Sequence, residues 1–122
     1  MGLGRGLRRV KRGDVVAVVL PGRHGKPRPG LVVQHDAFAA LPSVTLLPLT
    51  SELRRLPIVR IPVELGAATG LRVPSEVQID KVMTVPREKL GARIGTLDEG
   101  TMQRVDEALG RFLGIGWTSP GE

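Results

Sequence analysis

Residues 14–20 read DVVAVVL, a run of valines that favours extended backbone. Pro21-Gly22 follows directly and is a turn signal. The segment therefore predicts a β-strand that begins at Asp14. The whole chain has 122 residues, which fits one domain with a buried core.

Further strands are predicted on the C-terminal side of this segment. Three are short runs of β-branched and aliphatic residues: 31–35, 44–49 and 58–63. A longer stretch, EVQIDKVMTV (residues 76–85), alternates apolar and polar side chains. The alternation slips in phase at Asp80-Lys81, which predicts a β-bulge inside one long strand. Bulges are common beside active sites.

The segment PGRHGKPRPG, residues 21–30, separates the first two predicted strands. It holds three prolines and three glycines. Because proline fixes φ and lacks a backbone N–H, we expect an exposed, semi-rigid connection without a regular element.

Near the C-terminus the hydrophobic period changes to that of a helix. Apolar residues recur on one helix face at Met102, Val105, Leu109 and Phe112. Thr96 and Glu99 have the spacing of a capping box, and Gly114 is a typical stop, so the helix is predicted over residues 98–113. Short strands followed by one helix predict a mainly β fold, a small curved barrel with a helix over an opening.

Composition excludes several classes of protein. The chain has no cysteine and two histidines, so disulfide frameworks, thiolate sites and most zinc sites are excluded, and we expect neither metal nor cofactor. GxSxG, Walker and HExxH motifs are absent from the sequence. No apolar run reaches the roughly 18 residues of a membrane span, and the N-terminus does not match a signal peptide. These features predict a cytoplasmic protein without a membrane partner.

Positive charge is concentrated at the N-terminal end. Residues 1–30 hold eight of the 18 Lys and Arg residues and one acid, whereas the remainder has a net charge of −1. Such a field favours a polyanionic partner through counterion release. For residues 5–12 a solvated tail that binds nothing is an equal alternative. Three aromatic residues are too few for the base-stacking surface of a general single-strand binder.

Arg28 and Thr50 are candidates for phosphodiester chemistry. RNA carries its own nucleophile, the ribose 2′-hydroxyl, so a protein needs only to align it, help remove its proton and stabilise charge on the phosphate. An arginine fork suits the charged phosphate, and a threonine hydroxyl can orient it or relay a proton. Spacing alone also allows plain alternatives, with Arg28 an idle surface residue and Thr50 and Ser51 a turn cap.

The two histidines and the Asp80-Lys81 pair have similar alternatives. Imidazoles can act as an acid–base pair in RNA cleavage, and His24, in the basic loop, is the better candidate. His35 ends a predicted strand and fits a structural hydrogen bond better. Asp80 and Lys81 could form an ordinary exposed pair. The residue pattern by itself therefore predicts a small basic β domain.

Five blocks of the sequence, taken in order, carry a family resemblance. They are RGDVVAVVLPG (12–22), GKPRPGLVVQHD (25–36), VTLLPLTS (44–51), GLRVPSEVQIDKVMTVPREKLGARIGTLD (70–98) and VDEALGRFLGI (105–115). Together they resemble the MazF/PemK toxins of bacterial toxin–antitoxin modules. The resemblance covers residues 11–115, so we expect one barrel domain there, with a basic tail (1–10) and a flexible tail (116–122).

The resemblance implies an SH3-like barrel with a C-terminal helix, usually a homodimer. It also implies metal-independent endoribonuclease activity that leaves a cyclic phosphate and a free 5′-hydroxyl. The catalytic arginine of the family's Arg-Pro dipeptide falls on Arg28, and the threonine that closes the third strand falls on Thr50. Implied RNA contacts are Arg23, His24, Lys26, Ser51, Asp80 and Lys81.

Two departures leave the cleavage sequence open. The first loop is the short PGRHGK, and Met83 stands where many members have an arginine. The resulting hypothesis is a toxin that cuts single-stranded RNA, with mRNA the expected substrate rather than tRNA or rRNA, and so inhibits growth. Its partner would be an acidic, partly disordered antitoxin that folds into the same groove.

Two rival functions differ from this hypothesis in class. A toxin of the same barrel can act by binding DNA gyrase without cleaving RNA, in which case Arg28 and Thr50 are dispensable. A plain RNA-binding module of SH3-like form would need only the basic charge. Discrete cleavage of RNA in the presence of a chelator distinguishes the hypothesis from both rivals.

Overall fold

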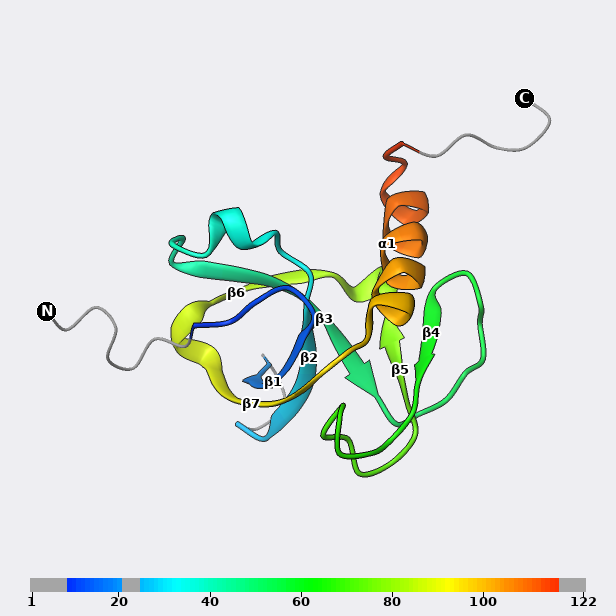
Figure 1. Ribbon diagram of the computed structural model, residues 1–122, viewed down its shortest axis with the longest axis horizontal. Helices are drawn as coiled ribbons and strands as arrows, with labels where there is room; N and C mark the ends of the chain where they lie inside the picture. Colours follow the sequence, from blue (N-terminus) through cyan, green and yellow to red (C-terminus); the bar gives the residue numbers. More distant parts are fainter. Residues whose placement is uncertain (1–8, 21–24, 117–122) are drawn as a thin grey trace, which may run out of the picture.

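The computed structural model describes residues 9–20 and 25–116 (Figure 1). The strands are β1 (Asp14–Val19), β2 (Pro27–Val32), β3 (Ser43–Thr50), β4 (Arg60–Val63), β5 (Ser75–Gln78), β6 (Met83–Pro86) and β7 (Leu90–Thr96). Short 3₁₀ turns are η2 (Asp36–Phe38), η3 (Ile79–Lys81) and η4 (Arg87–Lys89), and the helix is α1 (Glu99–Leu113). No helix in the described ranges is long and apolar enough to cross a membrane.

The strands form one antiparallel sheet in the order β4-β5-β3-β2-β1-β7, with β6 also paired to β3. The eight-residue strand β3 organises this arrangement, because different parts of it pair with different neighbours. Its first half pairs with β6, its middle with β2, and its last two residues, Leu49 and Thr50, with β5. The predicted fold class, a mainly β, SH3-like curved barrel with a C-terminal helix, is confirmed.

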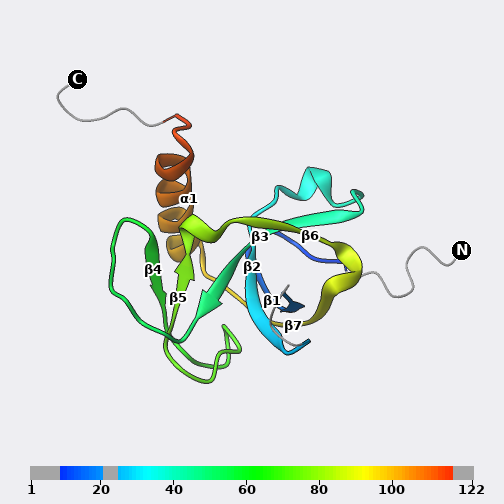
Figure 2. The same cartoon turned by 180° about the vertical axis from the view of Figure 1, so that it is seen from behind.

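Two apolar clusters form the core, one on each face of the sheet. Successive strand residues point to opposite faces, so Val15 belongs to one cluster and Val16 to the other. α1 covers the first cluster with Val105 and Ala108, which are both buried. The helix contacts η3 and β4, and Figures 1 and 2 both show it at the β4–β5 end of the sheet.

Strand β2 differs from the predicted loop over 21–30 and the predicted strand over 31–35. It begins at Pro27 and ends at Val32, because residues 27–29 pair with β1 while β3 pairs only from Gly30 onward. Prolines are accepted where a strand has a free edge, which explains this strand despite its composition. The residues before it, 21–24, lie outside the described part of the chain.

The prediction of one bulged strand over residues 76–85 is wrong. The structure has two strands, β5 and β6, separated by the turn η3 at Ile79–Lys81. The phase slip at Asp80-Lys81 marks this turn. The prediction failed because both strands pair with β3, at its opposite ends, so the chain turns between them.

The predicted helix is confirmed, but its capping box is not. The side chain of Asp98 accepts a hydrogen bond from the Thr101 backbone N–H at 2.8 Å and so caps α1, whereas Thr96 is the last residue of β7. Hydrogen bonds with Thr101 lower the pKa of the Asp98 carboxyl. At the other end Gly114 has a φ of 73° and stops the helix as predicted.

Strand β7 is not predicted by the sequence pattern, since LGARIGT contains two glycines and does not alternate. Tertiary contacts explain one of these glycines. A Cβ at Gly95 would lie 2.2 Å from the carbonyl carbon of Thr69, and the Thr96 N–H donates to the Ala68 carbonyl at 2.9 Å. The 64–74 segment thus lies directly against β7.

Candidate active site

A cleft of about 1060 Å³ lies where β2 and β3 diverge. The two strands pair only from Gly30 to Val32, after which β3 continues alongside β5. Prolines 27, 29 and 48 stand where the pairing stops, and proline has no N–H with which to continue a ladder. The cleft therefore opens between the β1–β2 part of the sheet and the β3–β5 part.

Strand register places Arg28 and Thr50 together at this opening. Gly30 pairs with Pro48, and Arg28 and Thr50 each lie two residues further along their strands. Residues two apart share a face of a sheet, so both side chains are on one face. Both residues line the cleft, Arg28 exposed and Thr50 half-buried.

The hydroxyl of Thr50 is held by a turn. Its Oγ1 accepts a hydrogen bond from the Glu52 backbone N–H at 3.0 Å. A hydroxyl has one donor and two acceptor sites, so this contact leaves its hydrogen free to turn toward another acceptor. The alternative of a turn cap is therefore correct for Thr50, yet the same residue lines the cleft.

The other predicted site residues divide into three groups. Ser51 and Lys81 line the cleft with Arg28 and Thr50. Lys26 and Asp80 are exposed and do not line it. The remaining two, Arg23 and His24, lie outside the described residues.

His35 has the structural role expected for it. Its Nδ1 accepts a hydrogen bond from the Ala37 backbone N–H at 2.9 Å, and the residue caps η2. It does not line the cleft.

Sequence reasoning missed four polar residues in the cleft, Glu52, Arg72, Ser75 and Gln78. Gln78 ends β5, and its Nε2 reaches the Pro48 carbonyl at 3.5 Å. Gln78 occupies a polar position in the alternation of residues 76–85, and this pattern could have indicated that its side chain lies outside the apolar core. Arg72 lies in the 64–74 segment, which Figures 1 and 2 show near the end of β3 and which has no periodic signal.

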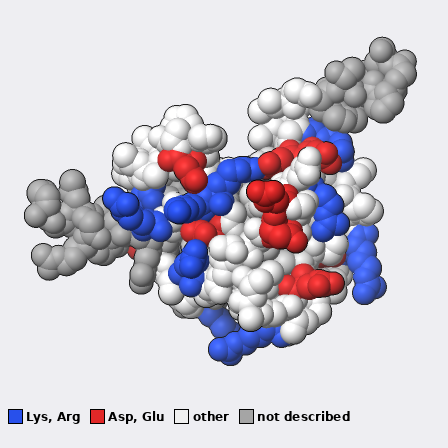
Figure 3. All heavy atoms as spheres, in the orientation of Figure 1, with Lys and Arg blue, Asp and Glu red and all other residues white. Residues whose placement is uncertain are grey.

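The polar lining of the cleft has a cationic excess. Among the described residues, Arg28, Arg72 and Lys81 carry positive charge in the lining, and Glu52 is its one acidic residue. On the face drawn in Figure 3, by contrast, basic and acidic side chains are interspersed. Within residues 9–20 and 25–116, no three His, Cys, Asp or Glu side chains are grouped to hold a metal ion.

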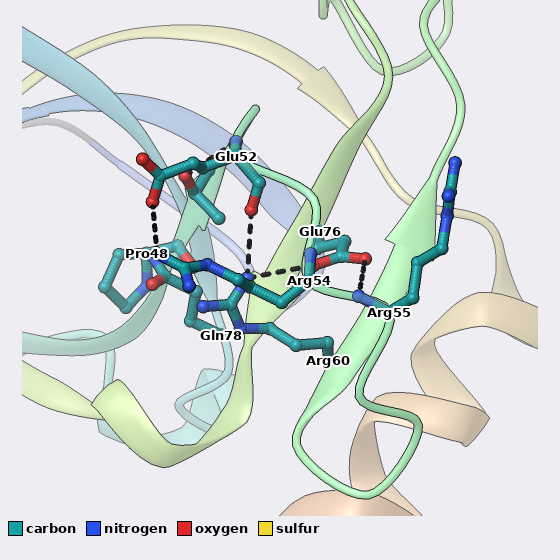
Figure 4. Close-up of polar contacts among 8 residues, drawn as sticks. Pro48, Glu52, Arg54, Arg55, Arg60, Glu76 and Gln78 are labelled. Atoms are coloured by element: carbon teal, nitrogen blue, oxygen red, sulfur yellow. Dashed lines mark hydrogen bonds and ion pairs between the residues drawn. The ribbon is translucent and has the colours of Figure 1, made fainter.

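A buried carboxylate, Glu76, lies next to Thr50 across the β3–β5 ladder, and Figure 4 shows the arginines that surround it. Its side chain accepts hydrogen bonds from the backbone N–H groups of Arg54 and Arg55, both at 3.0 Å, and from Arg60 Nη1 at 2.9 Å. Burial is the largest single influence and on its own raises the pKa of Glu76. The three hydrogen bonds and the Arg60 charge outweigh it together and lower that pKa below its ordinary 4.5.

The fold and the cleft define a small β-barrel protein with cations and hydroxyls where two strands diverge. The chain belongs to the family described as PemK-like, MazF-like toxins of type II toxin–antitoxin systems, whose sequence model matches residues 11–113.

Individual relatives agree with this assignment. The chain is 47% identical over 107 residues to a probable endoribonuclease MazF of Mycolicibacterium smegmatis, covering 87% of this chain and 98% of the relative. The solved structure of Mycobacterium tuberculosis toxin MazF-mt6 superposes with a TM-score of 0.74 at 30% identity, over 85% of this chain and 99% of that one. A mycobacterial endoribonuclease solved in complex with its cognate antitoxin has a TM-score of 0.70 at 25% identity, over 92% and 100%.

Proposed function

We propose that this toxin is an endoribonuclease that cuts single-stranded RNA in the cleft between β2 and β3. The observation that carries the proposal is the β2–β3 register, which puts Arg28 and Thr50 on one face at the mouth of one cleft. The naming of its relative as a probable endoribonuclease supports the same activity.

In the proposed reaction the 2′-oxygen attacks the adjacent phosphorus and the bond from phosphorus to the 5′-oxygen breaks. The 2′-hydroxyl loses its proton, the departing 5′-oxygen gains one, and a 2′,3′-cyclic phosphate remains. Arg28 stabilises charge on the phosphate with two parallel N–H donors, which is usually the largest catalytic effect in such a site. Thr50 donates its hydroxyl hydrogen to a phosphate oxygen or passes a proton. Because RNA supplies the nucleophile, the step needs no metal.

RNA binding involves a wider set of residues in this proposal. Ser51 and Lys81 contact the nucleotides in the cleft, and Gln78 and Arg72 extend its polar lining. Lys26 and Asp80 are exposed and each is next in sequence to a residue that lines the cleft, and Arg23 and His24 belong to the same basic loop as Lys26. The proposed tails remain residues 1–10 and 116–122, but the first ends at the barrel itself, because Val10 is buried in the second core cluster.

We also propose that the toxin works as a cytoplasmic homodimer and is neutralised by an acidic antitoxin. An acidic, partly disordered segment would enter the cationic cleft and order there, excluding RNA. The solved complex of a related mycobacterial endoribonuclease with its cognate antitoxin supports a partner of this kind.

The test is to incubate the purified protein with single-stranded RNA in the presence of a chelator. We expect discrete fragments with cyclic phosphate and 5′-hydroxyl ends, and no cleavage of the same sequence with 2′-deoxy nucleotides. Intact RNA together with inhibited gyrase supercoiling would contradict the proposal and favour a gyrase-binding toxin. RNA that is bound but not cut would favour a plain binding module.

A further inference from the structure

The connection between β3 and β4 crosses the end of β5. Strand β5 lies between β3 and β4 in the sheet, although β4 precedes it in sequence. Residues 51–59 must therefore pass over β5 to reach the far side. Glu76 is the β5 residue at this crossing, because it pairs with Thr50 on one side and with Pro62 on the other.

The carboxylate of Glu76 holds this crossing segment from beneath. The residue is 3% exposed. Oε1 accepts from the Arg54 N–H and from Arg60 Nη1, and Oε2 accepts from the Arg55 N–H. Arg55 has a φ of 54°, a left-handed conformation that is costly for a residue other than glycine. Fixing its N–H offsets part of that cost.

A chain of hydrogen bonds leads from this carboxylate to the hydroxyl of Thr50. Arg60 Nη1 bonds Glu76 and also donates to the Glu52 carbonyl at 3.2 Å (Figure 4). Glu52 in turn donates its backbone N–H to Thr50 Oγ1. The position and direction of the Thr50 hydroxyl therefore depend on a group outside the cleft lining.

We infer that Glu76 is a positioning residue for RNA cleavage, acting through Arg60 and the 51–55 turn to aim the Thr50 hydroxyl at the phosphate. This inference rests on the proposed function. Small misplacements of a reacting group are costly, about 10²-fold in rate for a shift of about 1 Å. Substrate affinity depends on the cleft residues themselves and should change much less.

The Glu76→Gln variant has nearly the same shape but replaces one of the two hydrogen-bond-accepting oxygens of Glu76 with an NH₂ group. A carboxylate offers acceptors at both oxygens, whereas an amide offers one oxygen and one NH₂ donor. Whichever way the amide is turned, its NH₂ faces at least one of the Arg54 and Arg55 N–H groups. One anchor of the turn is therefore lost with little change in volume.

The experiment compares kcat and KM for the wild type and Glu76→Gln on one RNA, with affinity measured on a 2′-O-methyl analogue that cannot be cut. We expect kcat to fall about 10²-fold, KM and analogue affinity to change less than about threefold, and hydrogen exchange to quicken at Arg54 or Arg55. The matched control is Asp14→Asn, another buried carboxylate, 4% exposed, which bonds the Lys11 N–H away from the cleft lining. It should lower Tm without lowering kcat.

Arg60→Met provides a second variant if Glu76→Gln does not fold. It breaks the link to the Glu52 carbonyl but keeps both backbone bonds to Glu76, and we expect kcat to fall with KM preserved. A folded variant that loses these bonds yet keeps wild-type kcat would overturn the inference and leave the proposed function intact. A fall in kcat for Asp14→Asn as large as that for Glu76→Gln would also overturn the inference. Absence of cleavage by the wild type would instead overturn the proposed function.

Discussion

Arg28 and Thr50 owe their proposed roles to position more than to residue type. Several arginines are exposed, and Arg72 even lines the same cleft. Only Arg28 lies two residues beyond the last β2–β3 pair, on the same face as Thr50. Substitutions of these two residues should therefore lower the cleavage rate strongly and change the free energy of unfolding little.

Replacing Arg28 with alanine should abolish most activity while leaving the fold intact. Loss of one charge-stabilising donor lowers rate by about 10²–10³-fold, and an exposed side chain contributes little to stability. Arg28→Lys should recover only part of the rate, because lysine lacks the bidentate fork. Cleavage rates and Tm are the measurements, with Arg104→Ala, an exposed arginine of α1, as control. Wild-type kcat/KM in Arg28→Ala would remove this residue from the mechanism.

Thr50 should tolerate serine but not valine. Serine keeps the Oγ that accepts from the Glu52 N–H, whereas valine keeps the shape and loses both the acceptor and the hydroxyl. We expect Thr50→Val to lose about 10²-fold in kcat and about 1 kcal/mol of unfolding free energy. Single-turnover kinetics and urea denaturation measure the two effects. Equal kcat in the serine and valine variants would exclude a role for the hydroxyl.

Two structural elements, strand β7 and the 64–74 segment, together form one wall of the cleft. Ile94 of β7 lines the cleft together with Gly70 and Leu71 of the segment. The two pieces approach so closely that a Cβ at Gly70 would lie 1.9 Å from the Ile94 carbonyl oxygen. Glycine is therefore a packing requirement of this wall.

Gly95→Ala should consequently destabilise the protein and disturb the cleft. The added methyl group meets backbone atoms of residues 68 and 69, which cannot rotate away as a side chain could. We expect a loss of about 1–3 kcal/mol, measured by urea denaturation, and reduced cleavage. Gly100→Ala is the matched control, since it lies in α1 with open space around it, and it should stabilise by about 0.5–1 kcal/mol. A neutral Gly95→Ala would contradict the close packing.

Charge acts at the scale of the whole molecule, through both folding and RNA binding. The net charge of the chain is +6, and in the part that the structure describes three of the cations line the cleft, Arg28, Arg72 and Lys81. The buried carboxylate of Glu76 supplies the opposite charge behind the turn. Acid and salt should therefore affect the molecule in different ways.

Acid should remove the stability that Glu76 contributes. Its pKa is lowered in the folded state, so the contribution is complete above the ordinary value of 4.5 and is lost as pH falls through the folded value. The Tm difference between wild type and Glu76→Gln should therefore be large at neutral pH and should shrink as the pH falls below the ordinary 4.5. Thermal melts across this range measure it. A difference independent of pH would contradict the lowered pKa.

Salt should weaken RNA binding in proportion to the phosphate contacts. Three cations in the cleft predict a slope of about −2 for log affinity against log salt with a single-stranded substrate. Lys81→Ala should reduce the slope by about 0.7. Binding titrations with the 2′-O-methyl analogue at several salt concentrations check this. A much steeper slope in the wild type would indicate phosphate contacts outside the cleft, with the basic residues 1–30 as the first candidates.

The sequence alone determined the features that depend on near neighbours. The valine run of β1, the helical period of α1 and the stop at Gly114 follow from local sterics and hydrogen bonding. The family resemblance singled out Arg28 and Thr50, because each lies within a short sequence motif that can be read without knowledge of the fold.

Only the tertiary structure decided which strands pair, and therefore where the cleft opens. Residues 76–85 become two strands because β3 offers separate places to pair at its two ends, and β7 forms because β1 offers it an edge. Arg72, Gln78 and Glu76 gain their significance from these pairings. The physical reason is that strand pairing joins residues far apart in the chain, and no local periodicity reports the identity of the partner.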